Sequence, residues 1–85
     1  MSEFIVELYV SRADAESVTS AGRRARLAAR ALTFLGTPVR YLRSIYIPED
    51  ETCLLVFEAA SADAVREAAR GATLSFERVA EAVAR

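Results

Sequence analysis

Three charged residues stand inside segments that are otherwise apolar, and they are the first candidates for chemistry. Glu7, Arg43 and Glu58 each lie in a run rich in Val, Ile, Leu, Phe and Tyr. Two carboxylates flanking a guanidinium could orient a polar ligand, or hold a cation through oxygen ligands. Tyr9 and Tyr41 occur in the same runs and could add phenol hydroxyls to such a pocket. The structural alternative for these five residues is an ion-pair network with aromatic anchors in a protein interface.

A second candidate site is the acidic turn in the middle of the chain. Glu49, Asp50 and Glu51 follow Pro48, and Cys53 comes two residues later. Carboxylates in a turn can attract a divalent cation, preferably Mg²⁺, Ca²⁺ or Mn²⁺, and a thiol adds a softer ligand. The alternative is a solvated turn beside a buried Cys that acts as a small hydrophobic residue. Metal binding by Glu49, Asp50, Glu51 and Cys53 is therefore an expectation for the structure to test.

The composition excludes several classes of chemistry. The chain of 85 residues has no His and one Cys, so a single copy holds no Ser-His-Asp triad, no Cys-His pair, no His-rich zinc site and no intrachain disulfide. A formal net charge of -1 argues against a general nucleic-acid binder. No apolar run is long enough to span a bilayer, and no signal-peptide pattern is visible. We therefore expect a cytoplasmic protein with neither a nucleic-acid nor a membrane partner.

A group of arginines is the third feature of the charge pattern. Arg23, Arg26 and Arg30 fall on one side of the helix expected around them, opposite an apolar stripe. They could meet an acidic partner. A solvated helix face is the simpler interpretation, because an Ala-rich helix needs charge for solubility.

Hydrophobic periodicity predicts a single domain over residues 1–85 with six elements. The expected elements, in order, are a strand over 3–10, a helix from about 11 to 35, strands over 39–47 and 52–59, a helix over 61–70, and a strand near 78–84. The last strand rests on topology, since a fourth strand is needed to pair with an otherwise bare sheet edge. Its Ala and Glu content would also suit a helix.

The order β-α-β-β-α-β predicts an α+β, ferredoxin-like fold in which both helices cover one face of a four-stranded antiparallel sheet. The purely apolar set, expected beneath the helices, is Phe4, Val6, Leu8, Cys53, Leu55 and Phe57. The opposite face would carry Ile5, Glu7, Tyr9, Tyr41, Arg43, Ile45, Leu54, Val56 and Glu58. That many large apolar side chains exceed what a monomer usually exposes, so we expect a homodimer in which two helix-free sheet faces meet.

Several stretches also carry a resemblance to a known family. Residues 40–53 read RYLRSIYIPEDETC, followed by FEA at 57–59, AVREA at 64–68 and FERV at 76–79. These stretches resemble a family of small bacterial proteins with a domain of unknown function, some of whose members are described as nickel-binding. The resemblance implies a dimeric ferredoxin-like fold. Many relatives carry a His that this chain lacks, so nickel binding here would need oxygen ligands together with Cys53 or backbone groups.

These observations give a leading hypothesis and an alternative from another class. The leading hypothesis is a cytosolic homodimeric binding protein that holds nickel, another divalent metal ion or a small polar ligand near the dimer interface. The expected ligand-binding residues are Glu7, Tyr9, Tyr41, Arg43 and Glu58. The alternative is a cofactor-independent enzyme of the dimeric α/β-barrel kind, such as a small monooxygenase or isomerase, with Tyr, Glu and Arg as acid, base and oxyanion partner. A structural or assembly domain is the third interpretation.

Overall fold

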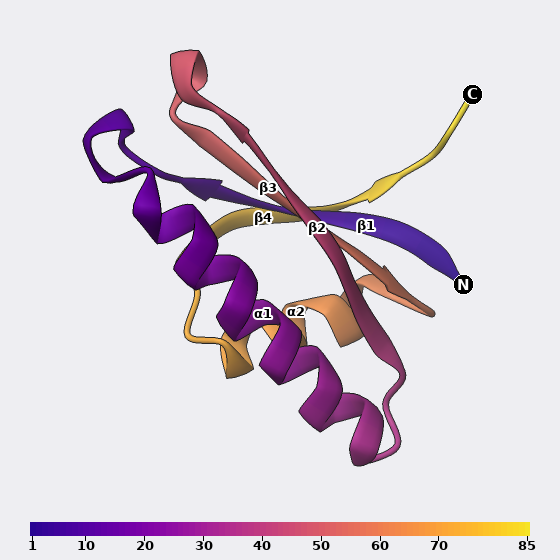
Figure 1. The fold of residues 1–85 in the computed structure, drawn as a ribbon. Coiled ribbons are helices and arrows are strands. Elements are labelled where there is room, and N and C mark those ends of the chain that lie inside the picture. Colours follow the sequence, from indigo (N-terminus) through magenta and orange to yellow (C-terminus); the bar gives the residue numbers. More distant parts are fainter.

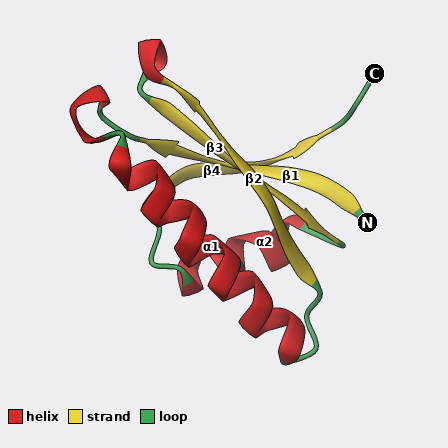
Figure 2. Ribbon diagram, viewed as in Figure 1, coloured by secondary structure: helices red, strands yellow, loops and turns green.

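The computed structural model describes residues 1–85 and consists of a four-stranded sheet with two α-helices (Figure 1). The strands are β1 (Ser2–Tyr9), β2 (Val39–Ile47), β3 (Thr52–Ala59) and β4 (Phe76–Ala82), and the helices are α1 (Glu16–Phe34) and α2 (Ala62–Gly71). Two short 3-10 helices, η1 (Arg12–Asp14) and η2 (Pro48–Asp50), lie at the same end of the sheet (Figure 2). The α+β class and the order β-α-β-β-α-β confirm the sequence prediction.

The N-terminal strand lies inside the sheet. The strand order is β2-β3-β1-β4, and all three pairings are antiparallel. Val6 of β1 is opposite Leu55 of β3 on one side and opposite Val79 of β4 on the other. Both α-helices cover the same face of the sheet and leave the other face without helices (Figure 1). Neither α-helix combines the length and hydropathy needed to cross a membrane.

The hydrophobic core fills the space between the helices and the sheet. The six residues predicted to lie beneath the helices are all buried: Phe4, Val6, Leu8, Cys53, Leu55 and Phe57. The helices face them mainly with alanines, of which Ala25, Ala68 and Ala69 are fully buried. Because Ala has a short side chain, the helix backbones approach the sheet closely, and larger residues on the strands supply most of the core volume.

The helices begin and end with recognisable capping interactions. Ser61 precedes α2, and its hydroxyl accepts a hydrogen bond from the backbone N–H of Ala64 at 3.2 Å, which satisfies one free donor of the first turn. At the other end of α2, the backbone N–H groups of Thr73 and Leu74 donate to the carbonyls of Arg70 and Ala69. This pair of bonds defines a Schellman motif, with Thr73 in the left-handed conformation at φ 54°.

The long helix α1 ends in the same way with a different residue at the critical position. The backbone N–H groups of Gly36 and Thr37 donate to the carbonyls of Thr33 and Leu32. Gly36 has φ 101°, a conformation that glycine adopts without a steric penalty. The two helices therefore share one terminating motif, occupied by Gly in α1 and by Thr in α2.

Two element boundaries differ from the sequence prediction. The first α-helix begins at Glu16 and not directly after Ser11, because the intervening residues form η1, whose Ala13 N–H donates to the Ser11 hydroxyl at 3.2 Å. The last strand exists as expected on topological grounds but begins at Phe76, which pairs with Leu8 of β1.

Candidate functional site

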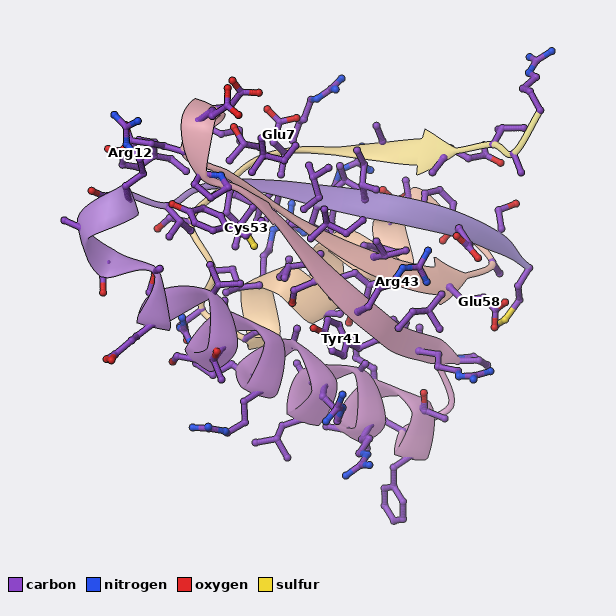
Figure 3. The ribbon with its side chains drawn as sticks, turned by 45° about the horizontal axis from the view of Figure 1, so that its top comes forward. Glu7, Arg12, Tyr41, Arg43, Cys53 and Glu58 are labelled. Atoms are coloured by element: carbon purple, nitrogen blue, oxygen red, sulfur yellow. The ribbon has the colours of Figure 1, made fainter.

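The helix-free face of the sheet carries Glu7, Arg43 and Glu58 among the residues that the sequence singled out (Figure 3). Directly opposite residues of an antiparallel pair share a face, so the register assigns to this face Glu3, Ile5, Glu7, Tyr9, Arg40, Arg43, Ile45, Ile47, Leu54, Val56, Glu58 and Arg78. Tyr9 is 63% exposed, Ile45 42% and Ile47 37%, whereas Val56 near the centre is only 3% exposed. The face therefore combines an apolar surface with charged groups.

Four of the charged residues on this face form two separate ion pairs. The Arg78 Nε donates to Glu7 Oε2 at 3.1 Å, and an Arg40 guanidinium nitrogen lies 3.8 Å from Glu58 Oε1. Arg43 forms no ion pair within the chain. The expected group of Glu7, Arg43 and Glu58 is thus not formed inside one copy. Strand β3 separates the strands of Glu7 and Arg43, and each carboxylate has a closer arginine.

A bulge in β2 places Tyr41 on the opposite side of the sheet from the predicted one. Tyr41 is opposite Phe57 and Arg43 is opposite Val56, so two steps along β2 match one step along β3 and Leu42 is the additional residue. An extra residue breaks the simple alternation of side chains. The prediction that Tyr41 shares the helix-free face with Arg43 is therefore wrong, because Tyr41 lies on the helix-covered side.

Tyr41 is held on that side by contacts to three elements. Its ring packs edge-on against Phe57, with 5.7 Å between centroids and 69° between ring planes. The Arg26 guanidinium of α1 lies 5.3 Å from the ring centroid, within cation–π range. The phenol hydroxyl hydrogen bonds with the hydroxyl of Ser44. A Cβ at Gly22 would be 2.7 Å from the phenol oxygen, so this glycine allows α1 to approach β2 closely.

The acidic turn has a structural role that involves Glu51. This residue adopts a left-handed conformation with φ 49°, and its backbone carbonyl accepts a hydrogen bond from the Val10 N–H at 2.9 Å. Its carboxylate accepts a second bond from the Arg12 N–H, also at 2.9 Å. Glu51 therefore joins the turn after β2 to the turn after β1. Glu49 and Asp50 lie in η2 and are exposed.

The predicted metal ligands are not brought together in the chain. Cys53 is fully buried among core residues beneath the helices, and burial raises the pKa of its thiol. The Glu51 carboxylate is directed to the backbone of Arg12. No group of three or more His, Cys, Asp or Glu side chains in residues 1–85 could hold a metal ion. The structure therefore does not bring Glu49, Asp50, Glu51 and Cys53 together as a site within the single chain, whose donor set does not fit nickel.

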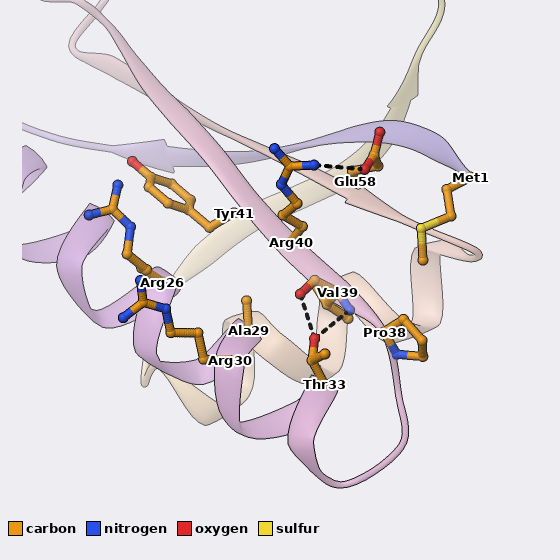
Figure 4. A pocket seen from close by; sticks show the side chains of 10 residues that line it. All are labelled: Met1, Arg26, Ala29, Arg30, Thr33, Pro38, Val39, Arg40, Tyr41 and Glu58. Carbon is orange, nitrogen blue, oxygen red and sulfur yellow. Dashed lines mark hydrogen bonds and ion pairs between the residues drawn. The ribbon is translucent and has the colours of Figure 1, made fainter.

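A cleft that the sequence did not indicate lies between α1 and β2 (Figure 4). It has a volume of about 510 Å³ and is lined by Met1, Arg26, Ala29, Arg30, Thr33, Pro38, Val39, Arg40, Tyr41 and Glu58. At one end the Thr33 hydroxyl donates to the Val39 carbonyl at 2.8 Å and accepts from the Val39 N–H at 3.0 Å. The cleft thus combines guanidiniums of α1 and β2 above an apolar floor.

The sequence held one signal for this cleft. The sequence predicts that Arg26 and Arg30 belong to a solvated helix face, and both are exposed in the structure. They are nevertheless one helical turn apart in a helix whose single acidic residue is Glu16, in the first turn. Like charges at this spacing repel each other when no carboxylate separates them. The unbalanced charge of α1 was therefore visible, but the third arginine, Arg40, comes from another element.

Comparisons with known proteins complete the description. A family model described as "Nickel responsive protein SCO4226-like" matches residues 4–82. The crystal structure of SCO4226 from Streptomyces coelicolor A3(2) superposes with a TM-score of 0.79 and covers 99% of both chains at 14% sequence identity. At that level of identity, the structural match shows a common fold. No curated protein sequence gives a significant match.

Proposed function

Because this chain belongs to the SCO4226-like family of nickel-responsive proteins, we propose that it is a cytosolic homodimeric binding protein. In this proposal two helix-free faces meet, and a divalent cation such as nickel, or a small polar ligand, is held near the interface. The observation that carries the proposal is the apolar surface of the helix-free face, where Tyr9, Ile45 and Ile47 are exposed in a domain with a small core.

A second copy is the partner that the charges of this face favour. In a two-fold interface both copies use the same face, so a contact between one residue of the first copy and another residue of the second occurs twice. A face that carries charges of both signs can therefore be complementary to itself. Arg43 has no carboxylate partner within its own chain, and in a dimer it can pair with an acidic residue of the other copy. Burying this arginine without such a partner would be costly.

The ligand set of a metal site supports the same arrangement. One chain brings no three potential ligands together, whereas two copies facing each other double the number of carboxylates at the interface. Glu3, Glu7 and Glu58 are the acidic residues of the helix-free face, and the proposal assigns Glu7 and Glu58 to the ligand. Since no imidazole is present and the thiol of Cys53 is buried, we expect nickel to bind weakly and with little selectivity over magnesium.

The assembly is tested by native mass spectrometry of untagged protein with one replacement on each side of the molecule. Ile45→Asp places an unpaired charge in the proposed interface and should give monomer or insoluble protein. Leu27→Asp is the matched control, because Leu27 is 59% exposed on α1, and it should stay dimeric. A soluble and fully dimeric Ile45→Asp protein would contradict the proposed interface.

The ligand is tested in two ways on the same preparation. The native mass spectrum reports any metal or small molecule that the dimer retains. Calorimetric titration with nickel, with magnesium and calcium as controls, then measures affinity and selectivity. Tight binding that is specific for nickel would contradict the expected oxygen-ligand site and would require ligands other than those of the helix-free face.

A further inference from the structure

We propose that the cleft between α1 and β2 binds a small organic anion that has a carboxylate or phosphate head group and an apolar body. This inference rests on Arg26 and Arg30 and not on the proposed dimer, although Arg40 and Glu58, which also line the cleft, belong to the helix-free face. Arg26 and Arg30 belong to α1, which covers the opposite side of the sheet from the helix-free face (Figures 1 and 4).

The cleft holds an excess of positive charge in a chain that is slightly acidic overall. Arg26, Arg30 and Arg40 line it, together with a single carboxylate, that of Glu58. Glu58 is occupied by Arg40 at 3.8 Å, and neither Arg26 nor Arg30 has an ion-pair partner. Two guanidiniums are therefore left without a counter-charge, although the net charge of the whole chain is -1. An anion in the cleft would supply that counter-charge.

The type of positive group decides which anions fit. A guanidinium presents a planar fork of N–H donors that matches the two oxygens of a carboxylate or phosphate. Arg26 and Arg30 are four residues apart, so their side chains leave the same side of α1. The Arg26 guanidinium is also positioned in advance by its contact with the Tyr41 ring at 5.3 Å. Because this side chain is already partly ordered, it loses less conformational entropy when a ligand binds.

The floor of the cleft indicates that the anion is organic. Ala29, Pro38, Val39 and the Tyr41 ring line it, and they offer an apolar surface that a bare inorganic ion would leave uncovered. The volume of about 510 Å³ lies within the range of small-molecule sites. A ligand with a charged head toward Arg26 and Arg30 and an apolar body over Val39 would use both properties of the cleft.

Calorimetric titration with four probes tests this assignment: phenyl phosphate, benzoate, inorganic phosphate and benzyl alcohol. We expect phenyl phosphate or benzoate to bind at least tenfold more tightly than either inorganic phosphate or benzyl alcohol. The tighter of the two aromatic anions identifies the preferred head group. Inorganic phosphate binding as tightly as both aromatic anions would overturn the apolar part of the proposal, and the absence of binding by both aromatic anions would overturn the whole.

Replacements in α1 locate the site. Arg30→Gln should weaken the better aromatic anion at least tenfold, because it removes one charge-assisted hydrogen bond. Arg30 forms no ion pair that the fold needs, and the unfolding transition of the variant provides a check on folding. Arg26→Gln is the second variant, and Arg70→Gln on α2 is the control that should bind like the wild type. Equal affinity in Arg30→Gln and Arg70→Gln would overturn the assignment. The native mass of both variants should equal that of the wild type, so that a change in affinity is not caused by a change in assembly.

Discussion

Replacing Thr73 by Gly should make the protein more stable, although the change removes a side chain. Thr73 ends α2 in the left-handed conformation, with φ 54°, where a β-branched residue is a genuine outlier. Its side chain is exposed and makes no hydrogen bond in the structure, so little contact energy is lost. The backbone bonds from its N–H to Arg70 and from Leu74 to Ala69 do not depend on the side chain.

The magnitude follows from two opposing terms. A left-handed conformation costs a residue with a Cβ about 1–2 kcal/mol, and glycine avoids this cost. Glycine loses more conformational freedom on folding, which offsets the gain by about 0.5–1 kcal/mol. The net gain for Thr73→Gly is therefore about 0.5–1 kcal/mol. In a domain of this size, that gain corresponds to a rise in Tm of roughly 2–8 °C.

The equivalent position of α1 supplies the matched control. Gly36 occupies the same place in the same motif at φ 101°, and a Cβ added there would contact nothing within 4 Å. Gly36→Thr should therefore lower stability through the backbone alone, by about 0.5–1 kcal/mol or more, because the same two terms apply with opposite sign. The stability of Thr73→Asn should fall between those of the wild type and Thr73→Gly, because Asn tolerates the left-handed region.

Urea unfolding followed by circular dichroism measures all three variants. Stability should rise in the order wild type, Thr73→Asn, Thr73→Gly, and the change at Gly36 should have the opposite sign. If Thr73→Gly leaves stability unchanged or lowers it while Gly36→Thr destabilises, then the strain assigned to Thr73 is not present.

Two further predictions concern Cys53 and the contact between α1 and β2. Burial raises the pKa of the Cys53 thiol in the folded chain. As the pH rises, the unfolded chain therefore loses this proton before the folded chain does. The stability that the neutral thiol confers is present below about pH 8.5 and falls as the pH rises above that value. Unfolding free energies between about pH 8 and 9.5 should decline more steeply in the wild type than in Cys53→Ala, and parallel slopes would contradict this. Gly22→Ala should destabilise by up to about 2 kcal/mol, because an overpacking cost of about 1–3 kcal/mol exceeds a helix-propensity gain of about 1 kcal/mol; the added Cβ lies 2.7 Å from the Tyr41 phenol oxygen. Gly71→Ala, whose Cβ would meet Ala28 at an ordinary 3.7 Å, should be neutral or stabilising in the same denaturation assay.

The sequence was sufficient to predict the order of elements and the face that the helices cover. Phe4, Val6 and Leu8 form a purely apolar set that alternates with the mixed set Glu3, Ile5, Glu7 and Tyr9, and the structure buries all three. The same reasoning failed in β2, because a period of two holds only where neither of two paired strands contains an extra residue. The bulge at Leu42 breaks that assumption and moves Tyr41 to the other side. A bulge depends on the pairing between two strands, which a single strand's pattern does not report.

The candidate sites were predicted less well for a related reason. Spacing along the chain placed Cys53 two residues from Glu51, but the alternation of β3 directs the thiol into the core while the carboxylate bonds to Arg12. The arginine cleft was missed because Arg30 and Arg40 come from different elements. In each case the sequence indicates the chemistry of the residue correctly but not how its element is placed relative to the others.

The central position of β1 has a consequence for how the chain is made. This strand precedes both of its partners, yet Val6 pairs with Leu55 and with Val79, which are synthesised much later. During synthesis, a strand with an apolar face and two unpaired edges must wait for most of the domain to emerge. Such a segment can associate with other chains until its partners arrive. The first strand to be synthesised is thus an inner strand of the sheet, and its second edge stays unpaired until the last strand, β4, has emerged.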